Sequence, residues 1–264
     1  MSRHGAFLDR LRAAGVPDPA GDLRRLTDWA FAGLDDTAPE GLARLEEAVN
    51  RRAAREPVSK IKGLRAFWKH EFEVTRDTLD PRPDTESLVE QALAAPFSRV
   101  LDLGTGTGCI AISLLSERPD AVGVATDTSD AALAVAARNA ARIGVEDRLK
   151  LIRADWFDGV DDRFDLVVSN PPYITPAEMA ALDPEVAQFD PAEALTPGGD
   201  GLHAYRAIAA GAPGHLAAGG RLFLEIGWKQ SDAVREIVAG AGFVDIVCHR
   251  DLGGRDRVIS AVRR

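Results

Sequence analysis

The amino-acid sequence predicts a doubly wound α/β domain built on a seven-stranded sheet, preceded by a small N-terminal helical domain and a linking β-hairpin. In residues 1–55, apolar residues recur every three or four positions, which is the period of amphipathic helices. From residue 98 onwards, short apolar runs alternate with helical segments, as is typical of a largely parallel sheet with helices on both faces. With 45% hydrophobic residues among 264, the chain can bury a sizeable core.

Strands are predicted where apolar runs are bounded by turn residues. They cover residues 99–103, 121–126, 149–153, 165–169 and 221–226, followed by two late strands at 244–248 and 257–261. The clearest helices between them are 130–143, 203–216 and 230–239. The turn-like residues 251–255 separate the last two strands, so we expect a hairpin that adds an antiparallel strand at one edge. In Rossmann-like sheets of this kind, ligands bind at the carboxyl ends of the strands.

The sequence divides into three parts. Breaks at residues 15–17 and 37–39 separate about three short helices, which make residues 1–66 a helical domain. Polar and apolar residues roughly alternate from Phe67 to Val74, so we expect a strand or hairpin there and assign 67–82 to a hairpin and linker. Residues 83–264 then form the α/β domain, whose first helix starts near Glu86.

Composition and charge exclude several classes of protein. A net charge of −9 argues against direct binding of nucleic acid through phosphate contacts. No run of about 18 apolar residues is present, so we expect no membrane span. The N-terminus lacks the apolar segment of a signal peptide, which together with only two cysteines indicates a reducing, cytoplasmic location. The five histidines and the cysteines (Cys109 and Cys248) have no metal-ligand spacing, and neither cysteine is placed as a nucleophile.

A glycine-rich turn follows the first strand of the α/β domain and opens a helix. Its residues are Gly104, Thr105, Gly106, Thr107 and Gly108. Glycines allow the backbone to approach a ligand closely, and the amides at a helix N-terminus favour negative groups. The dinucleotide fingerprint G-x-G-x-x-G is not met, because its last glycine would fall at Cys109. Taken alone, the pattern would also suit an ordinary tight turn.

Acidic residues around this turn indicate the ligand. Asp127 ends the second strand about 20 residues beyond the turn, where a carboxylate can accept hydrogen bonds from ribose hydroxyls. Asp102 lies just before the turn and suits an ammonium group, which S-adenosylmethionine has and a pyrophosphate lacks. Asp155 and Trp156 follow the third strand and offer a polar group and a flat apolar surface for an adenine, although Trp156 could equally be a core aromatic residue. We therefore expect S-adenosylmethionine rather than NAD.

The fourth strand ends in an unusual way. Its apolar run, residues 164–168, is followed by Ser169 and then by Asn170, Pro171, Pro172 and Tyr173. Two prolines cannot continue a ladder of hydrogen bonds, so the chain leaves the sheet stiffly. The side-chain oxygen of Asn170 and the carbonyl of Pro171 can each accept one N–H of a substrate amine or amide, aiming its lone pair at a methyl donor. Tyr173 would then wall the pocket. A simple turn would also explain Asn-Pro-Pro, but the glycine turn and Asp127 favour a site.

Taken together, these motifs resemble those of the protein-(glutamine-N5) methyltransferases of peptide chain release factors, the PrmC/HemK family. The resemblance covers roughly residues 50–264 and includes segments 101–108, 155–157 and 169–174. Asn-Pro-Pro-Tyr alone is shared with DNA adenine and ribosomal RNA guanine methyltransferases. The Arg-Pro-Asp-Thr-Glu segment from Arg82 to Glu86, together with the helical domain, is more discriminating.

The resemblance implies a Rossmann-like methyltransferase sheet and a function in translation termination. The partner would be a class 1 release factor, whose Gly-Gly-Gln loop carries the glutamine to be methylated; neither a membrane nor a nucleic acid is expected as a partner. It implies cofactor contacts from Asn170 as well as from the glycine turn, Asp127 and Trp156, and substrate contacts from Arg82 and Glu86. The alternatives are a nucleic-acid N-methyltransferase, acting on adenine N6 or guanine N2 of ribosomal RNA, and a non-catalytic adaptor with the same fold.

Overall fold

The computed structural model describes residues 3–264, which form two compact units. The helical unit contains the chain up to Leu64 together with Leu182–Asp190. The α/β unit contains Arg65–Ala181 and Pro191–Arg264. Residues 182–190 were predicted to belong to the α/β domain, but in the structure they pack with the N-terminal helices.

The helical unit has one more N-terminal helix than the sequence suggested. Its helices are α1 (Arg3–Ala13), α2 (Pro19–Ala30), α3 (Pro39–Ala53), the short α4 (Val58–Lys62) and α9 (Pro184–Phe189). Asp18 caps α2 by accepting a hydrogen bond from the Gly21 amide at 3.0 Å. The apolar side chains predicted to recur on one face form the core of the unit, and they include Phe7, Leu11, Leu23, Leu26, Leu45 and Val49.

Ion pairs hold residues 182–190 in this unit. The buried Arg52 donates to Asp22 at 2.7 Å and to Glu185 at 2.9 Å, and Arg55 donates to the other oxygen of Glu185 at 2.6 Å. Partial burial raises the pKa of Glu185, but the hydrogen bonds from Arg55 and Arg52 outweigh it and lower that pKa to about 2. Lys60 and Asp190 form a further buried pair at 3.3 Å. Residues 182–190 are therefore attached to the helical unit through charged groups at both ends.

The linking hairpin starts earlier than predicted. Its strands are β1 (Leu64–Phe67) and β2 (His70–Glu73), so the expected hairpin is present but begins three residues before residue 67. Its Phe67 and Phe72 rings pack edge to face, 5.9 Å apart, within the core of the α/β unit. The Asn139 side chain bonds both backbone groups of Glu73, which fixes the end of the hairpin against that unit.

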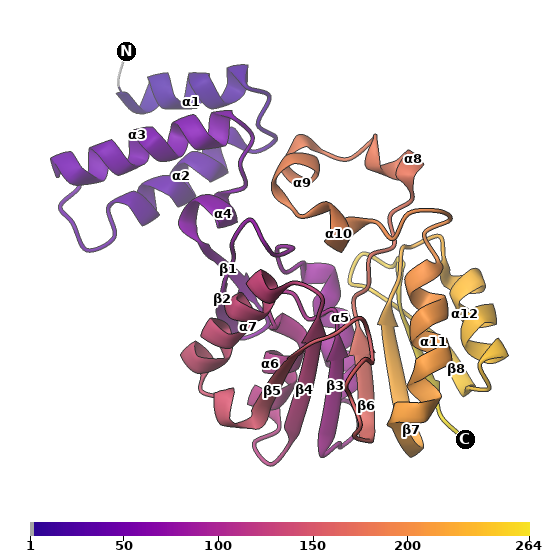
Figure 1. The fold of residues 1–264 in the computed structure, drawn as a ribbon. Helices are drawn as coiled ribbons and strands as arrows, with labels where there is room; N and C mark the ends of the chain where they lie inside the picture. The colour runs from indigo at the N-terminus through magenta and orange to yellow at the C-terminus, as the bar shows by residue number, and fades with distance from the viewer. Residues whose placement is uncertain (1–2) are drawn as a thin grey trace. The chain divides into compact units, whose positions relative to one another are not determined.

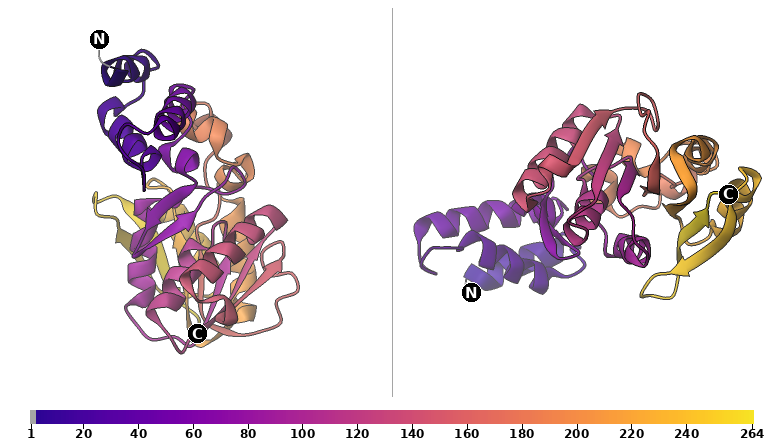
Figure 2. Two further views of the ribbon diagram at one scale, coloured as in Figure 1. Left: turned by 90° about the vertical axis from the view of Figure 1, so that its left-hand side faces the viewer. Right: turned by 90° about the horizontal axis from the view of Figure 1, so that it is seen from below.

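The seven-stranded sheet of the α/β unit confirms the predicted fold class. The strand order is β5-β4-β3-β6-β7-β9-β8, and β5 to β7 can be seen side by side in Figure 1. The strands are β3 (Arg99–Leu103), β4 (Val122–Asp127), β5 (Leu149–Arg153), β6 (Phe164–Ser169), β7 (Leu216–Glu225), β8 (Val244–Arg250) and β9 (Asp256–Val262). All neighbours are parallel except β9, which is antiparallel to β7 and β8, as expected for a terminal hairpin. This hairpin, in yellow, lies at one edge of the sheet (Figure 2).

Helices cover both faces of the sheet. On one face, Val100 of β3 packs in a cluster with residues of α5 (Glu86–Leu93) and α6 (Cys109–Glu117). On the other, Leu101 and Leu103 pack with residues of α11 (His203–His215) and α12 (Ser231–Gly240). The remaining elements of this unit are η1 (Pro83–Thr85), α7 (Asp130–Ile143), η2 (Glu146–Arg148), α8 (Pro176–Met179) and α10 (Ala192–Leu195). Neighbouring residues of a strand point to opposite faces, so both clusters share the same strands.

The observed elements differ from the predicted ones mainly at their ends. Strand β7 starts at Leu216 rather than at residue 221, because its first half contains Gly219 and Gly220, which have no side chains to show a strand pattern. Among residues 3–264, no helix has the length and apolar character needed to cross a membrane.

The strand order determines where a ligand can bind. The chain adds β4 and then β5 on one side of β3. It then crosses to the other side of β3, where β6 and the later strands lie, so the strand order reverses between β3 and β6. At such a switch point the loops that follow the two strands diverge and leave a crevice. Leu103 is paired with Ser169, which places the glycine turn and Asn170 at the same edge of the sheet.

We predict that Arg52→Ala lowers the free energy of unfolding of the helical unit by about 2 kcal/mol, because the buried Asp22 then keeps only its ion pair with the half-exposed Arg25. Hydrogen exchange of amides in α2 and α3 would measure this loss. Arg12→Ala is the control, since its ion pair with Asp9 is exposed and contributes at most about 1 kcal/mol. Equal protection in the two variants would contradict the prediction.

Candidate active site

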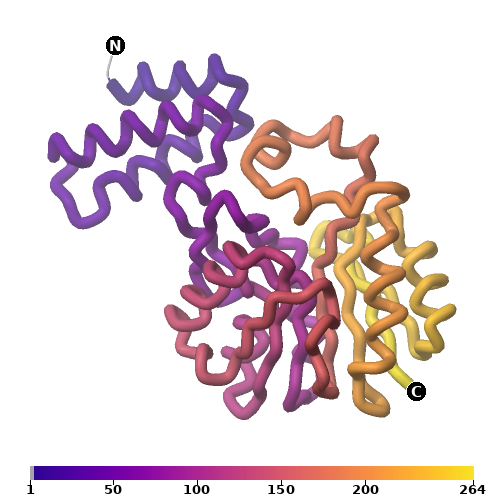
Figure 3. The backbone as a smooth tube through the Cα atoms, in the orientation of Figure 1, coloured from indigo at the N-terminus to yellow at the C-terminus, as the bar shows by residue number. Residues whose placement is uncertain are grey.

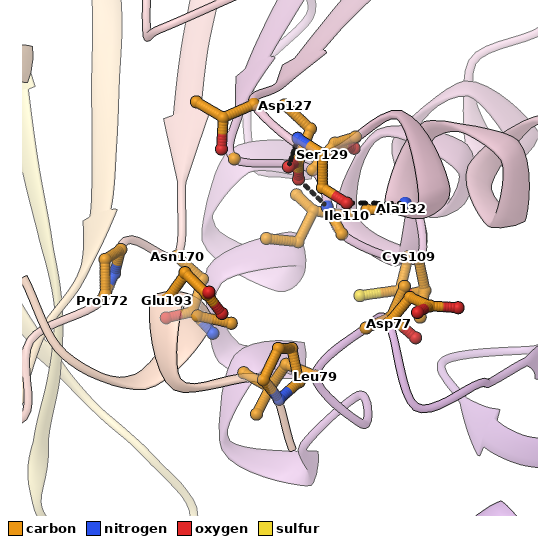
Figure 4. Close-up of a pocket in the computed structure, with 18 of the residues that line it drawn as sticks. Asp77, Leu79, Cys109, Ile110, Asp127, Ser129, Ala132, Asn170, Pro172 and Glu193 are labelled. Atoms are coloured by element: carbon orange, nitrogen blue, oxygen red, sulfur yellow. Dashed lines mark hydrogen bonds between the residues drawn. The ribbon is translucent and has the colours of Figure 1, made fainter. Parts of the chain in front are cut away.

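A cavity of about 520 Å³ lies at the carboxyl edge of the sheet, within the α/β unit. It is bounded by the glycine turn, by the ends of β4, β5 and β6, and by the chain that leads from the hairpin to α5 (Figure 4). The predicted site residues that line it are Arg82, Gly104, Thr105, Gly106, Thr107, Asp127, Asp155, Trp156, Asn170 and Pro172.

The three glycines of the turn have different roles. All have positive φ angles, which glycine adopts without strain. A Cβ atom on Gly106 would meet no atom within 4 Å, and one on Gly104 would meet only Trp156, at 3.9 Å. At Gly108, however, it would lie 2.7 Å from the Ile112 side chain. Gly104 and Gly106 therefore leave room on the cavity side, whereas Gly108, which does not line the cavity, permits close packing of α6.

Asp127 holds the turn and still has acceptor capacity. Its Oδ2 accepts a hydrogen bond from the Gly106 amide and its Oδ1 one from the Ser129 amide, both at 2.9 Å. Each carboxylate oxygen has two lone pairs, so each can accept one more hydrogen bond. The carboxylate lines the cavity and is thus suited to a pair of neighbouring hydroxyl groups, as in a ribose.

Asp102 lies beneath the turn rather than in the cavity wall. Its Oδ2 accepts hydrogen bonds from the Thr105 hydroxyl at 2.6 Å and from the Ala111 amide at 3.3 Å. Its Oδ1 is buried and has no hydrogen-bond partner among residues 3–264. Burial raises the pKa of Asp102 to about 7, against the opposing effect of these two donors. A cation bound above the turn would stabilise its charged form.

Trp156 supplies a flat apolar surface on the cavity wall. It adopts a positive φ of 53°, which is uncommon for a residue with a side chain. Its carbonyl accepts a hydrogen bond from the Thr126 hydroxyl at 3.0 Å, and its ring also packs on the core shared with α11 and α12. Trp156 therefore both lines the cavity and packs on the core, and its contact with an adenine stays a prediction.

Asn170 extends from the end of β6, where the chain can be followed out of the sheet in Figure 3. The preceding Ser169 donates its hydroxyl to the Leu103 carbonyl at 2.7 Å, which ties β6 to β3 immediately before the motif. The Asn170 amide nitrogen donates to the Thr85 hydroxyl at 3.3 Å. No donor in the described chain reaches Asn170 Oδ1, so this oxygen remains an acceptor for a ligand.

Other predicted residues lie outside the cavity lining. Glu86 accepts a hydrogen bond from the Trp68 amide at 2.8 Å and so supports the hairpin turn. The Tyr173 ring packs on the core of the sheet, and its carbonyl accepts from Gln230 at 3.1 Å. Burial raises the pKa of the Tyr173 phenol well above its usual value. Pro171, like Asp102 and Gly108, is buried without lining the cavity.

The structure adds residues that the sequence analysis did not single out. The chain from Arg76 to Pro81 lines the cavity, as do Thr85, Ser129 and Glu193. Glu193 and Asn170 line the same cavity, although they are far apart in sequence (Figure 4). Only Thr85 carried a signal, because it lies within the Arg82–Glu86 motif. Cys109 also lines the cavity, but burial raises its pKa to about 12, so the thiol stays protonated and is a poor nucleophile.

The geometry fits an adenosyl ligand that carries a cation. Asp127 offers acceptors for hydroxyl groups, and Trp156 offers a surface for a flat ring. Beneath the turn, Asp102 has a buried oxygen that receives no hydrogen bond from residues 3–264, and its negative charge would favour a cation. On the opposite wall, Asn170 presents an acceptor to whatever lies next to that ligand (Figure 4). Such a site can hold S-adenosylmethionine and bind a second molecule through its N–H groups.

Comparisons with known proteins agree with this geometry. Residues 75–201 match the family model "Methyltransferase small domain". A release factor glutamine methyltransferase of Cereibacter sphaeroides is 57% identical over 97% of this chain and 95% of its own length. One from Rhodospirillum rubrum is 45% identical over 98% of this chain and 85% of its own.

One solved structure is similar to this chain in fold but not closely in sequence. The crystal structure of a methyltransferase from Pyrococcus furiosus matches 84% of this chain and 97% of its own, with a TM-score of 0.56 at 17% identity. That match supports the methyltransferase fold. The identity to the two bacterial relatives, along nearly the whole chain, places this protein in the release factor glutamine methyltransferase family.

Proposed function

We propose that this protein methylates the side-chain amide nitrogen, N5, of the glutamine in the Gly-Gly-Gln loop of class 1 peptide chain release factors. The observation that carries the proposal is the acceptor oxygen of Asn170, which lies across the cavity from Asp127 and has no donor within the described chain. The names of the relatives, which act on release factors, support the choice of substrate. Because translation termination is cytoplasmic, the protein would act there.

The cofactor would occupy the part of the cavity formed by the glycine turn. Asp127 would bind the ribose hydroxyls, Trp156 would cover the adenine, and Asp155 would contribute a polar group. When bound, S-adenosylmethionine supplies a methyl group on a positively charged sulfur, which a nucleophile can displace in line. The negative charge of Asp102 beneath the turn would favour the ammonium group of the cofactor.

The role of Asn170 follows from the chemistry of a glutamine amide. The nitrogen lone pair is delocalised into the carbonyl, so the amide is a poor nucleophile. Asn170 Oδ1 would accept one N–H, which orients the nitrogen and holds it near the donor. The Pro171 carbonyl, expected from the sequence to accept the other N–H, belongs to a residue that does not line the cavity, so it would do so only for a substrate that reaches beyond this lining. The two prolines keep the chain after Asn170 stiff. No strong base is needed before attack, because the proton can leave after the new N–C bond has formed.

We further propose that the helical unit recognises the body of the release factor, while Arg82 and Glu86 act near the glutamine loop. The cavity lies entirely within the α/β unit, so the helical unit is not needed to form it. Binding a folded protein requires a surface beyond a cavity of this size, and the helical unit is the other compact part of the chain.

We predict that wild-type enzyme transfers labelled methyl groups to the glutamine of a purified class 1 release factor, and that Asn170→Ala lowers the rate on the order of 100-fold. Cofactor affinity measured by calorimetry should change little, because Asn170 acts on the substrate. The control is Asp130→Ala, which removes an exposed carboxylate of the α/β unit that does not line the cavity. Mass spectrometry locates the label; a label elsewhere would refute the substrate, and full activity of Asn170→Ala would refute its role.

We predict that Asp127→Ala weakens S-adenosylmethionine binding by about 1–3 kcal/mol, because hydrogen bonds to a charged acceptor are lost. Asp127→Asn retains one acceptor oxygen and should lose less. The control is Asp130→Ala, which removes a nearby exposed carboxylate that does not line the cavity. Calorimetric titration measures the dissociation constants, and an unchanged value for Asp127→Ala would rule out ribose recognition by this residue.

We predict that deletion of residues 1–63, which keeps the hairpin strand β1, leaves cofactor binding within about threefold but abolishes methylation of the intact release factor. Because Glu185 loses its partners in this deletion, the control is full-length Glu185→Gln, which loosens residues 182–190 but keeps the helices. If the control loses methylation to the same extent, the attachment of that segment rather than recognition by the helices explains the loss.

A further inference from the structure

Glu225 is a buried carboxylate that the mechanism above does not use. It is the last residue of β7 and follows Leu224, which is paired with Ser169, so it lies level with Asn170 on the neighbouring strand. The residue is only 2% exposed, and its Oε2 has no hydrogen-bond partner among residues 3–264. Burying a carboxylate without full hydrogen bonding costs stability, so its presence at this point calls for an explanation.

Thr85 connects this carboxylate to the site. It is 2% exposed and lies in η1, immediately before α5. Its hydroxyl accepts a hydrogen bond from the Asn170 amide nitrogen at 3.3 Å, and it also hydrogen-bonds to the Glu225 carboxylate. A hydroxyl has a single proton, and an ionised carboxylate can only accept. The Thr85 proton is therefore directed to Glu225, and its lone pairs are left for the Asn170 NH₂ group.

We propose that Glu225 and Thr85 are positioning residues that orient the Asn170 amide, so that its nitrogen points to Thr85 and its oxygen points to the substrate. An asparagine amide is nearly symmetric in shape, so packing alone barely distinguishes the two orientations. In the reversed orientation, Asn170 would present an NH₂ group to the NH₂ group of the substrate, and neither could accept. This inference rests on the proposed function, because the orientation matters only for a substrate that donates N–H.

The hydrogen bonds from Asn170 to Thr85 and from Thr85 to Glu225 form a relay. The direction of this relay depends on the charge of Glu225. Burial raises the pKa of Glu225 to about 7, and the Thr85 hydrogen bond opposes that rise. A protonated Glu225 could donate to Thr85, whose own proton could then turn to Asn170 and favour the reversed amide. Above this pKa the relay has the productive direction, and it is lost as the pH falls below about 7. The charged and titratable groups that act on Glu225 or feel its charge are Arg257, Asp84, Arg82, Tyr173, Tyr205 and Cys109.

Substitutions at Thr85 test the relay in the methylation assay. Thr85→Val keeps the shape but removes the hydroxyl, and we expect kcat to fall about 10- to 100-fold while cofactor affinity stays within about threefold. Thr85→Ser keeps the hydroxyl and should restore most of kcat. At saturating S-adenosylmethionine, whose positive charge would keep Asp102 ionised, Glu225→Gln should remove the acidic limb of the kcat profile near pH 7. If Thr85→Val and Thr85→Ser have equal kcat values, the relay does not operate in catalysis.

A second measurement needs no substrate and therefore separates the relay from the proposed function. The side-chain NH₂ resonances of Asn170 are identified by their absence in Asn170→Ala. In the wild-type protein they should titrate with a midpoint near pH 7, and this titration should persist in Thr85→Ser but vanish in Thr85→Val and Glu225→Gln. A titration that persists in Thr85→Val overturns the proposal, as does its absence from the wild type. Lack of methylation by a wild-type protein that shows the titration would instead count against the proposed function.

Discussion

The site depends on the pairing of β3 with β6 at the point where the strand order reverses. The glycine turn follows one strand and Asn170 follows the other, and the register Leu103 to Ser169 brings them to the same level. The Ser169 hydroxyl strengthens this junction by bonding the Leu103 carbonyl. A slip of two residues would displace Asn170 by about 6.6 Å relative to the turn, which exceeds the tolerance of an in-line transfer. The proposed methyl-donor site and the proposed substrate clamp, which consists of Asn170 and the prolines after it, would thus be positioned by one pair of strands.

Buried carboxylates flank this junction on both sides. Asp102 supports the glycine turn, Glu225 lies beside the clamp, and burial raises the pKa of each to about 7. Since the pKa of each group is higher in the folded than in the unfolded chain, the folded state binds more protons at mildly acidic pH. Their contribution to stability therefore decreases as the pH rises from about 4 to above 7. The charge that suits the proposed chemistry is thus obtained at a cost in folding free energy, which the two apolar clusters on the sheet must offset.

The chain that leaves the clamp has a second structural role. Beyond Tyr173 it forms α8 within the α/β unit, then contributes residues 182–190 to the helical unit, and returns through α10 to the cavity wall at Glu193. Glu185 is held by two arginines and Asp190 by Lys60, so this contribution depends on ion pairs rather than on apolar burial alone. The same stretch of backbone thus belongs to both units and to the cavity.

By itself, the sequence determined the elements and residues whose physical signal is local. Short apolar runs bounded by turn residues predicted the seven strands, and the glycine turn, Asp127 and Asn170 were predicted because each directly follows a predicted strand and differs chemically from a core residue. The resemblance of these motifs to a methyltransferase family agrees with the relatives found for the chain.

Only the tertiary structure decided which residues distant in sequence come together. Glu193 and Glu225 have ordinary sequence surroundings, and Thr85 stood out only as part of the Arg82–Glu86 motif. That Thr85 and Glu193 line the same cavity as Asn170, and that Glu225 lies level with it, follows from the strand order and from the path of the chain between strands. The different roles of Gly104 and Gly108 likewise depend on what lies opposite each Cα, which is open cavity in one case and the Ile112 side chain in the other. Long-range packing leaves no periodic trace in the sequence, because a contact between distant residues is set by the fold and not by their neighbours.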